Sequence, residues 1–159
     1  MKGNNAAIHL TIYNDVLSSQ IQNQVIEFWL QHGVLNQRAA RERVSDVLII
    51  ARNTENKIIG IFTYALKYIP LLRNYMYLIR LSISPGNSSA FLVLKMGKMA
   101  YEVLKEKAKT EQKKPLGLFA LIQNNKMIRK WNWAIWPRLP FIYIGSTNSG
   151  HHRRVLYFK

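Results

Sequence analysis

The residues best suited to chemistry in this chain form a short polar turn, Pro85–Ser89 (PGNSS). The hydrophobic pattern predicts a strand over Tyr75–Ser84 before it, a helix over Ala90–Lys109 after it and a second strand over Leu116–Gln123. Two strands joined by such a helix are expected to be parallel, with a right-handed crossover. The helix N-terminus then points its free N–H groups and positive dipole end into a cleft, which favours a phosphate-bearing ligand. A plain turn with a serine helix cap is the alternative interpretation.

A second candidate site combines aromatic and basic residues in the last third of the chain. Three tryptophans, Trp131, Trp133 and Trp136, occur there. They could belong to the core, wall a pocket for a long acyl chain, or stack on unpaired bases beside a phosphate-binding surface. The basic residues beside them are candidates for polyanion binding: Lys126, Arg129, Lys130 and Arg138.

Other catalytic patterns are missing from the sequence. The four histidines have no metal-binding spacing with carboxylates and the chain has no cysteine, so no metal site is predicted. No serine–histidine–acid triad, Walker loop or dinucleotide fingerprint is present. A water relay to Tyr64, Tyr77 or Tyr143 is conceivable, but no catalytic residue can be assigned.

Positive charge is concentrated toward the C-terminus. The net charge is +15; residues 1–94 carry +4 and residues 95–159 carry +11, from fourteen basic and three acidic side chains. Such a field attracts nucleic acid, an acidic carrier protein, anionic lipid or a phosphorylated cofactor. A solvated basic face without a dedicated partner is the alternative.

The composition predicts one globular domain over residues 1–159, because 48% of the residues are hydrophobic. No run approaches the about 18 apolar residues of a membrane span, and the N-terminus lacks the apolar centre of a secretory signal. Together with the lack of cysteine, these features lead us to expect a cytoplasmic protein.

The remaining elements follow from periodicity and capping residues. Asn14 or Asp15 is expected to cap a first helix that closes at Gly33. We expect further strands over Ala7–Tyr13, Val47–Arg52, Ile58–Leu66, Phe141–Gly145 and Arg154–Phe158, and further helices over Gln37–Val44 and Lys126–Trp136. Gly60 indicates a bulge or a close backbone approach.

The order of these elements resembles the GNAT acyltransferase superfamily over nearly the whole chain. The fragments that carry the resemblance are VLIIARNTENKIIGIFTY, LIRLSISPGNSSAFLVLKMGKMAYEVL and LFALIQNNKMIRKW. They look like the family's second and third strands, its fourth strand with the acyl-CoA loop and following helix, and its fifth strand with an Asn-led helix. The resemblance implies an α/β fold with a mixed, mostly antiparallel sheet of about seven strands, a central splayed parallel pair and flanking helices.

The resemblance also implies a donor site between the two central strands. Strand backbone groups would pair with the pantetheine amides, amides of the turn would cradle the pyrophosphate, and an asparagine would touch the cofactor arm. The residues at these positions are Leu81, Ser82, Ile83, Gly86, Asn87, Ser88, Ser89 and Asn124. The donor would be acetyl-CoA, another acyl-CoA or an acyl thioester on a carrier protein, and the acceptor an amine.

The chain departs from the family pattern at two positions. Phe91 replaces a glycine of the family's loop, and Trp131 replaces the tyrosine that usually protonates the leaving thiolate. We therefore expect either an acyl-CoA-dependent N-acyltransferase or a module of the same fold that lost the chemistry and binds nucleic acid or protein. A variant joins both ideas: an acyltransferase acting on charged tRNA, as in some toxins of this superfamily.

Overall fold

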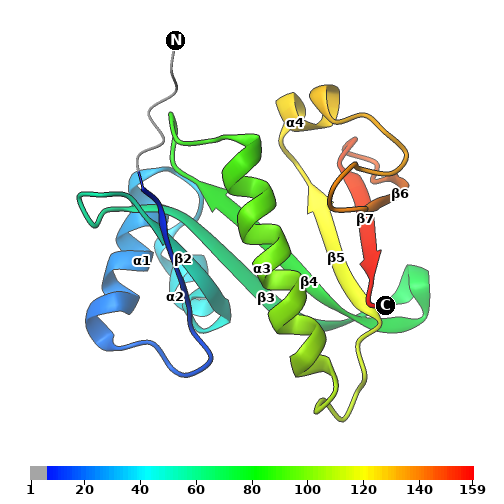
Figure 1. Cartoon of the computed structure of the whole chain (residues 1–159), viewed down its shortest axis with the longest axis horizontal. Helices are drawn as coiled ribbons and strands as arrows, with labels where there is room; N and C mark the ends of the chain where they lie inside the picture. Colours follow the sequence, from blue (N-terminus) through cyan, green and yellow to red (C-terminus); the bar gives the residue numbers. More distant parts are fainter. Residues whose placement is uncertain (1–6) are drawn as a thin grey trace. The chain divides into compact units, whose positions relative to one another are not determined.

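The computed structural model describes residues 7–159, which form seven strands and four α-helices (Figure 1). The strands are β1 (His9–Ile12), β2 (Val47–Arg52), β3 (Ile58–Ile69), β4 (Asn74–Ile83), β5 (Gly117–Ile122), β6 (Ile142–Ser146) and β7 (His152–Tyr157). The helices are α1 (Ser19–Gln31), α2 (Gln37–Arg43), α3 (Ala90–Ala108) and α4 (Asn125–Lys130), with 3-10 turns at η1 (Val44–Asp46) and η2 (Pro70–Leu72).

The strands form one mixed sheet in the order β1-β2-β3-β4-β5-β7-β6. β4 and β5 are parallel, and their register runs from Tyr77 opposite Leu118 to Ile79 opposite Ala120. The pairs β1/β2, β2/β3, β5/β7 and β6/β7 are antiparallel. The predicted fold class, a mostly antiparallel sheet with a central parallel pair and flanking helices, is confirmed. The splaying of that pair remains a prediction.

Backbone contacts divide the chain into two compact units. Unit 1 comprises the described residues up to Thr63 together with Leu81–Met96, and unit 2 comprises Tyr64–Arg80 together with Gly97–Lys159. β3, β4 and α3 pass from one unit into the other. The single domain expected over residues 1–159 stays a prediction.

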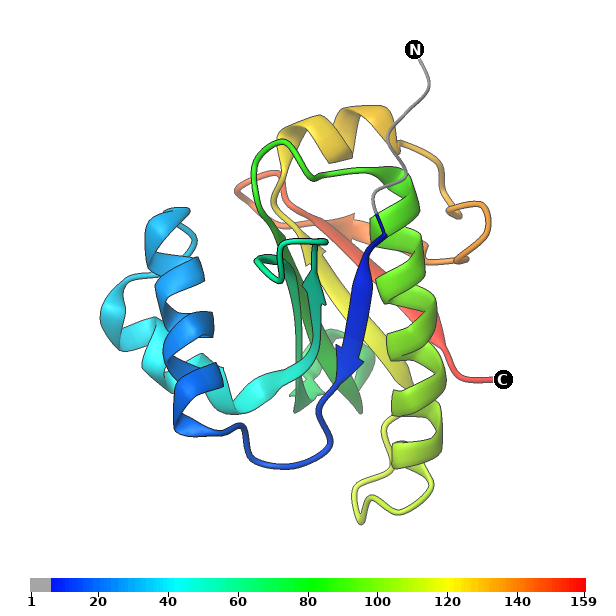
Figure 2. The same ribbon diagram turned by 60° about the vertical axis from the view of Figure 1, so that its left-hand side comes forward.

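The core of unit 1 lies between α1, α2 and the strands β2 and β3. Figure 2 shows the two helices side by side against one face of these strands. Phe28 and Trp29 of α1 are buried against Ile50 of β2 and Ile61 of β3. The bulge predicted at Gly60 is confirmed, because the register of β2 and β3 shifts between the pair Ala51–Gly60 and the pair Arg52–Ile58; a Cβ at Gly60 would also lie 3.3 Å from the Met96 sulfur of α3.

The core of unit 2 is built on β4, β5 and β7. Met76, Phe119 and Val155, one from each strand, form its buried cluster. Gly117 lets β5 approach β7 closely, because a Cβ there would contact the backbone of Leu156 and lie 2.7 Å from the Cα of Tyr157. The C-terminal strand is thereby held against the parallel pair.

Two predicted helix boundaries are wrong. α1 begins at Ser19 rather than after Asn14 or Asp15, because Ser18 is its cap and accepts a hydrogen bond from the amide of Ile21 at 3.3 Å. α4 ends at Lys130, although a helix was expected to run to Trp136. The predicted closure of α1 at Gly33 is confirmed, since this residue has φ +64°.

Candidate functional site

The predicted turn between β4 and α3 exists and is tied to β3. Ser84 is buried, its amide donates to the carbonyl of Ile59 at 2.9 Å, and its hydroxyl reaches the same carbonyl at 3.3 Å. Asn87 donates from its side-chain amide to the Ser84 hydroxyl at 2.8 Å and from its backbone to the Ser84 carbonyl at 3.1 Å. Gly86 has φ +82°, a conformation that side-chain-bearing residues rarely adopt. Of the backbone amides in the turn, only that of Asn87 donates a hydrogen bond within it. The backbone amides of Gly86 and Ser88 take no part in the turn's hydrogen bonds.

The first turn of α3 continues directly from this segment. The hydroxyl oxygen of Ser89 accepts a hydrogen bond from the amide of Leu92 at 3.1 Å, and its carbonyl accepts from Val93 at 3.1 Å. Ser89 therefore caps α3, as the serine-cap interpretation expects. Phe91 is 63% exposed, and the ammonium of Lys95 lies 5.7 Å from the centre of its ring. The ring thus lies on the outer surface of the helix.

Seven of the eight predicted donor-site residues belong to unit 1 and lie within residues 81–89. Leu81, Ser82 and Ile83 are half-buried at the end of β4, and the turn residues 86–89 are exposed. Asn124 belongs to unit 2, where it caps α4 and accepts hydrogen bonds from the amides of Lys126 and Met127 at 3.0 and 3.2 Å. Its side-chain oxygen is therefore already used by the helix end.

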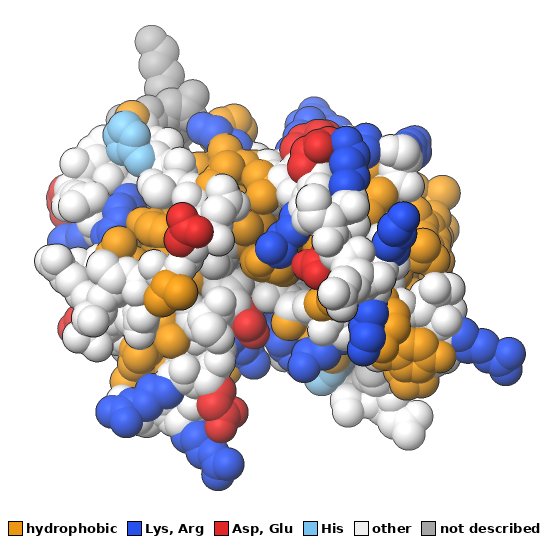
Figure 3. Space-filling model, turned by 90° about the horizontal axis from the view of Figure 1, so that it is seen from below, with side chains coloured by type: hydrophobic (Ala, Val, Ile, Leu, Met, Phe, Trp, Pro, Cys, Tyr) orange, Lys and Arg blue, Asp and Glu red, His pale blue; other side chains and the backbone are white. Residues whose placement is uncertain are grey.

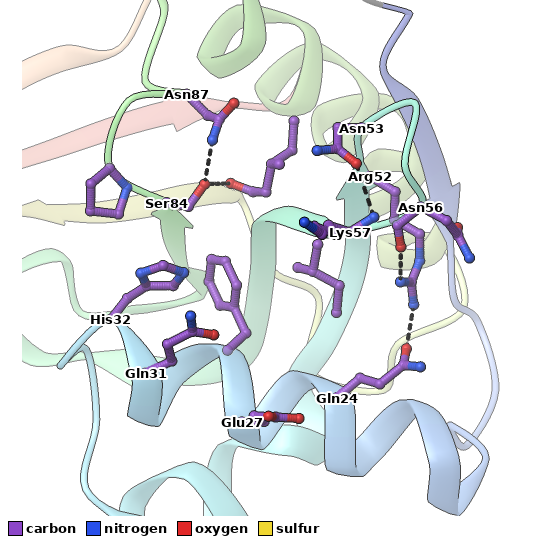
Figure 4. Close-up of a pocket in the computed structure, with 14 residues that line it drawn as sticks. Gln24, Glu27, Gln31, His32, Arg52, Asn53, Asn56, Lys57, Ser84 and Asn87 are labelled. Atoms are coloured by element: carbon purple, nitrogen blue, oxygen red, sulfur yellow. Dashed lines mark hydrogen bonds between the residues drawn. The ribbon is translucent and has the colours of Figure 1, made fainter.

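A polar pocket of about 450 Å³ opens in unit 1 beside this turn (Figure 4). It is bounded by one face of α1, the turn between β2 and β3, and the end of β4. Its polar lining includes Gln24, Glu27, Gln31, His32, Arg52, Asn53, Asn56, Lys57, Ser84 and Asn87. Sequence reasoning missed this pocket, because its walls come from three segments that no motif connects.

Most charged groups of the pocket are already paired. The guanidinium of Arg52 donates to the side-chain oxygen of Gln24 at 2.7 Å and to the carbonyl of Asn56 at 2.9 Å. Lys57 forms an ion pair with Glu55 at 3.0 Å. The side chain of Glu27, the only acidic residue of the lining, makes no hydrogen bond or ion pair with another described residue. The pocket therefore offers one unpaired carboxylate and several amide groups to a small polar molecule.

The predicted polyanion-binding residues all belong to unit 2. Lys126, Arg129 and Lys130 are exposed on α4, and Arg138 is exposed in the loop that follows, with φ +66°. None of these four forms an ion pair with a described acidic residue. Figure 3 shows one face of the molecule, on which lysine and arginine side chains are scattered, with acidic side chains among them. Lys126, Arg129, Lys130 and Arg138 have no acidic residue near them in the sequence, because none follows Glu111.

The tyrosines considered for a proton relay have different environments. Tyr77 is fully buried, and its hydroxyl hydrogen-bonds a carboxylate oxygen of Glu111 at 3.1 Å. Burial, followed by the charge of Glu111, raises the pKa of Tyr77 well above its usual range. Tyr143 is 39% exposed and shares a hydrogen bond with Ser146 at 2.8 Å. A phenol with so high a pKa is a weak proton donor, which counts against Tyr77 in a relay.

Among residues 7–159, no group of three or more histidine, aspartate or glutamate side chains is arranged to hold a metal ion. Within the same range, no helix combines the length and the hydropathy that a membrane crossing needs.

Comparison with known proteins finds similar structures but no similar sequence. No protein-family model and no curated protein sequence matches the chain significantly. An acetyltransferase of the GNAT family from Streptococcus pneumoniae matches with a TM-score of 0.66 at 11% identity, covering 96% of this chain and 99% of that one. AtaTR, solved with AcCoA bound, matches with a TM-score of 0.58 at 15% identity, covering 93% and 92%. NAA60 from Arabidopsis thaliana, solved with a bisubstrate analogue, matches with a TM-score of 0.59 at 10% identity, covering 96% and 99%.

These likenesses extend over nearly the full length of each protein, and the resemblance to GNAT acyltransferases is confirmed at the level of the fold. The chain has the GNAT fold. At 10–15% identity the likeness defines the architecture and leaves the chemistry to be argued from this chain's own residues.

Proposed function

We propose that the protein is a single-domain N-acyltransferase that takes an acyl group from acetyl-CoA or another acyl-CoA and transfers it to an amine. The observation that carries this proposal is the turn Ser84–Ser89, which connects β4 to the N-terminus of a 19-residue helix. Gly86 and Ser88 lie in that turn with amides outside its own hydrogen bonds. Free backbone amides in a turn that leads into a helix N-terminus suit the pyrophosphate of CoA.

The chemistry would follow the usual course of acyl transfer. The amine nitrogen attacks the thioester carbonyl, the carbonyl oxygen becomes an oxyanion, and the carbon–sulfur bond then breaks. A backbone amide at Leu81–Ile83 would stabilise the oxyanion. The products are an amide and free CoA. The amine loses one proton and the thiolate gains one, so the reaction balances.

The proton donor for the thiolate is not the family's tyrosine, because Trp131 occupies that position in the sequence. An indole N–H has no acidity near neutral pH, and the carbonyl of Trp131 accepts a hydrogen bond from the indole of Trp136 at 2.8 Å. Proton transfer from water is therefore the route that fits this chain.

Calorimetric titration tests the donor site directly. We expect the purified protein to bind acetyl-CoA, a longer acyl-CoA or an acyl-carrier protein, and the strongest of the three identifies the donor class. If none of them binds, the donor site is refuted.

A matched pair of variants tests the turn itself. Ser88 is exposed, so Ser88→Glu and Ser88→Gln should both fold. Only the glutamate adds a negative charge beside the phosphates, and we expect it to weaken acetyl-CoA binding at least about tenfold, about 1.4 kcal/mol, while the glutamine variant stays close to wild type. Equal weakening in both variants would mean that side-chain bulk, rather than phosphate recognition, matters at this position.

A second candidate function is a binding module that kept the fold and lost acyl transfer. Its support is Trp131 at the position of the family's acid and Phe91 at that of a loop glycine, together with the excess of basic residues after Lys95. Such a module would bind nucleic acid or an acidic protein without binding any acyl donor. The donor titration therefore separates the two functions.

A further inference from the structure

The three tryptophans after α4 have unequal environments. Trp136 is 6% exposed and packs edge-to-face against Trp131 at 5.3 Å and against Phe141 at 5.7 Å. Trp133 is 54% exposed, and Ile135 is 56% exposed. The indoles of Trp131 and Trp136 therefore pack against each other within the loop, and the indole of Trp133 is exposed to solvent.

A buried guanidinium holds this loop in place. Arg154 of β7 is 1% exposed and lies over the ring of Trp136, 4.5 Å from its centre. It donates hydrogen bonds to the carbonyls of Trp133 at 2.9 Å, Trp131 at 3.3 Å and Phe141 at 3.4 Å. The carbonyl of Trp133 accepts a hydrogen bond from a buried group, so the backbone of Trp133 is anchored to β7 while its side chain is exposed.

The basic residues that precede Trp133 in the sequence share one helix face. Lys126, Arg129 and Lys130 are spaced i, i+3 and i+4 on α4, so their side chains lie on the same side of the helix. α4 ends at Lys130, and Trp133 follows three residues later. From residue 112 to the end of the chain there are nine lysines and arginines and no acidic residue. No intramolecular carboxylate near in sequence competes for these cations.

We propose that Lys126, Arg129, Lys130, Trp133 and Arg138, together called the Trp133 surface, bind single-stranded nucleic acid. An unpaired base stacks on the indole of Trp133, and successive phosphates contact the cations of α4. Single strands favour this surface over other polyanions because they combine planar rings with regularly spaced negative charge. Acidic peptides and anionic membranes also offer negative charge, and both accept an exposed indole, so the experiments below include them as competitors. The site does not depend on acyl transfer and would operate under either proposed function.

Fluorescence anisotropy with a labelled single-stranded oligouridylate and the matching duplex tests this site. We expect tighter binding of the single strand. Trp133→Ala should weaken that binding by about 5- to 150-fold, since stacking on one aromatic side chain contributes about 1–3 kcal/mol. Trp133→Phe keeps an aromatic face and should retain most of the affinity. Both variants alter an exposed side chain, and thermal melting checks that they fold like the wild type.

Salt dependence tests the cations separately. Replacing Lys126, Arg129 and Lys130 together by glutamine should lower the slope of log affinity against log salt by about 2, because each lost phosphate contact contributes about 0.7 for single strands. The control variant replaces Lys98, Lys107 and Lys114, which are also exposed and removed from the Trp133 surface in sequence. It carries the same net charge and should change the slope less.

Three results would overturn the proposal. The first is a Trp133→Ala variant that binds the single strand as tightly as the wild type. The second is equal affinity for single strand and duplex, which would indicate attraction by charge alone. The third is tighter binding of polyglutamate or phosphatidylserine vesicles than of the oligonucleotide, which would assign the surface to an acidic protein or a membrane.

Discussion

The two compact units of this chain differ most in charge. Unit 1 contains seven lysines and arginines against five aspartates and glutamates, a net charge of +2, and unit 2 contains sixteen against three, a net charge of +13. Unit 1 nevertheless contains the turn proposed to hold a diphosphate. The two units therefore present two different means of binding an anion.

In unit 1 the proposed recognition is local and directional. Backbone amides of the turn after Ser84 act at hydrogen-bond distance and require the turn to keep its shape. In unit 2 the excess charge acts over about 10 Å at ordinary salt and imposes no geometry, apart from the stacking position at Trp133. Variants that disturb the turn after Ser84 should change only the binding of the diphosphate. Variants that disturb residues 131–138, called the Trp133 loop, should change only the binding of polyanions to unit 2.

The largest expected effect follows from removing the buried guanidinium of unit 2. Arg154→Met leaves two carbonyls of the Trp133 loop and the carbonyl of Phe141 without their donor in a buried setting, and we expect a loss of about 3 kcal/mol in unfolding free energy. Urea unfolding measures this loss. At low temperature, where the variant remains folded, oligonucleotide binding should fall while acetyl-CoA binding is kept.

The neighbouring residue provides the control for that variant. Arg153 is half-buried and donates one hydrogen bond, to the carbonyl of Ser146 at 2.7 Å. Arg153→Met removes the same charge and should cost about 1 kcal/mol or less. Equal losses in the two variants would show that Arg154 does not organise the loop.

A pH-dependent effect of intermediate size is expected from Tyr77 in unit 2. Burial and Glu111 raise its pKa in the folded state, so above about pH 10 the phenol loses its proton in the unfolded chain but keeps it in the folded one. Its contribution to stability is complete below that pH and is lost as the pH rises, with a slope of up to about 1.4 kcal/mol per pH unit.

Comparison with Tyr77→Phe isolates this contribution. The phenylalanine variant lacks the titrating group, so its unfolding free energy should fall less steeply above about pH 10 than that of the wild type. Parallel curves for the two proteins would contradict the buried, protonated state of Tyr77.

The smallest expected effect concerns the turn of unit 1. Ser84→Ala removes the hydroxyl that accepts a hydrogen bond from the Asn87 side chain and lies 3.3 Å from the Ile59 carbonyl. We expect a loss of about 1 kcal/mol in stability and a severalfold weaker binding of acetyl-CoA, with oligonucleotide binding unchanged. If the oligonucleotide is affected and acetyl-CoA is not, the division between the two units is wrong.

Local sequence signals were sufficient for most elements. β2 begins and ends at the predicted residues because a run of β-branched and aliphatic side chains is bounded by polar turns. Asn36, a residue type that favours helix N-caps, caps α2 by accepting from the amide of Ala39 at 2.9 Å. The turn after β4 was also predictable, since Pro, Gly, Asn and Ser occur together between two hydrophobic segments.

Two features depended on contacts distant in sequence. The predicted helix over Lys126–Trp136 ignores Arg154, which binds the carbonyl of Trp131, a group that a longer helix would use internally, and also the carbonyl of Trp133. The pocket of unit 1 combines α1, the β2–β3 turn and the end of β4, and periodicity along the chain carries no information on such a meeting. Tertiary hydrogen bonds therefore determine where α4 ends, and the topology of the chain determines where the pocket forms.

Hydrogen exchange of the backbone amides tests the central claim most directly. Exchange is followed by mass spectrometry with and without acetyl-CoA, on peptides covering residues 84–92 and 131–138. We predict slower exchange at Gly86–Ser89 when acetyl-CoA is present and unchanged exchange in the Trp133 loop. Unchanged exchange at Gly86–Ser89 under saturating acetyl-CoA would contradict a diphosphate site in this turn.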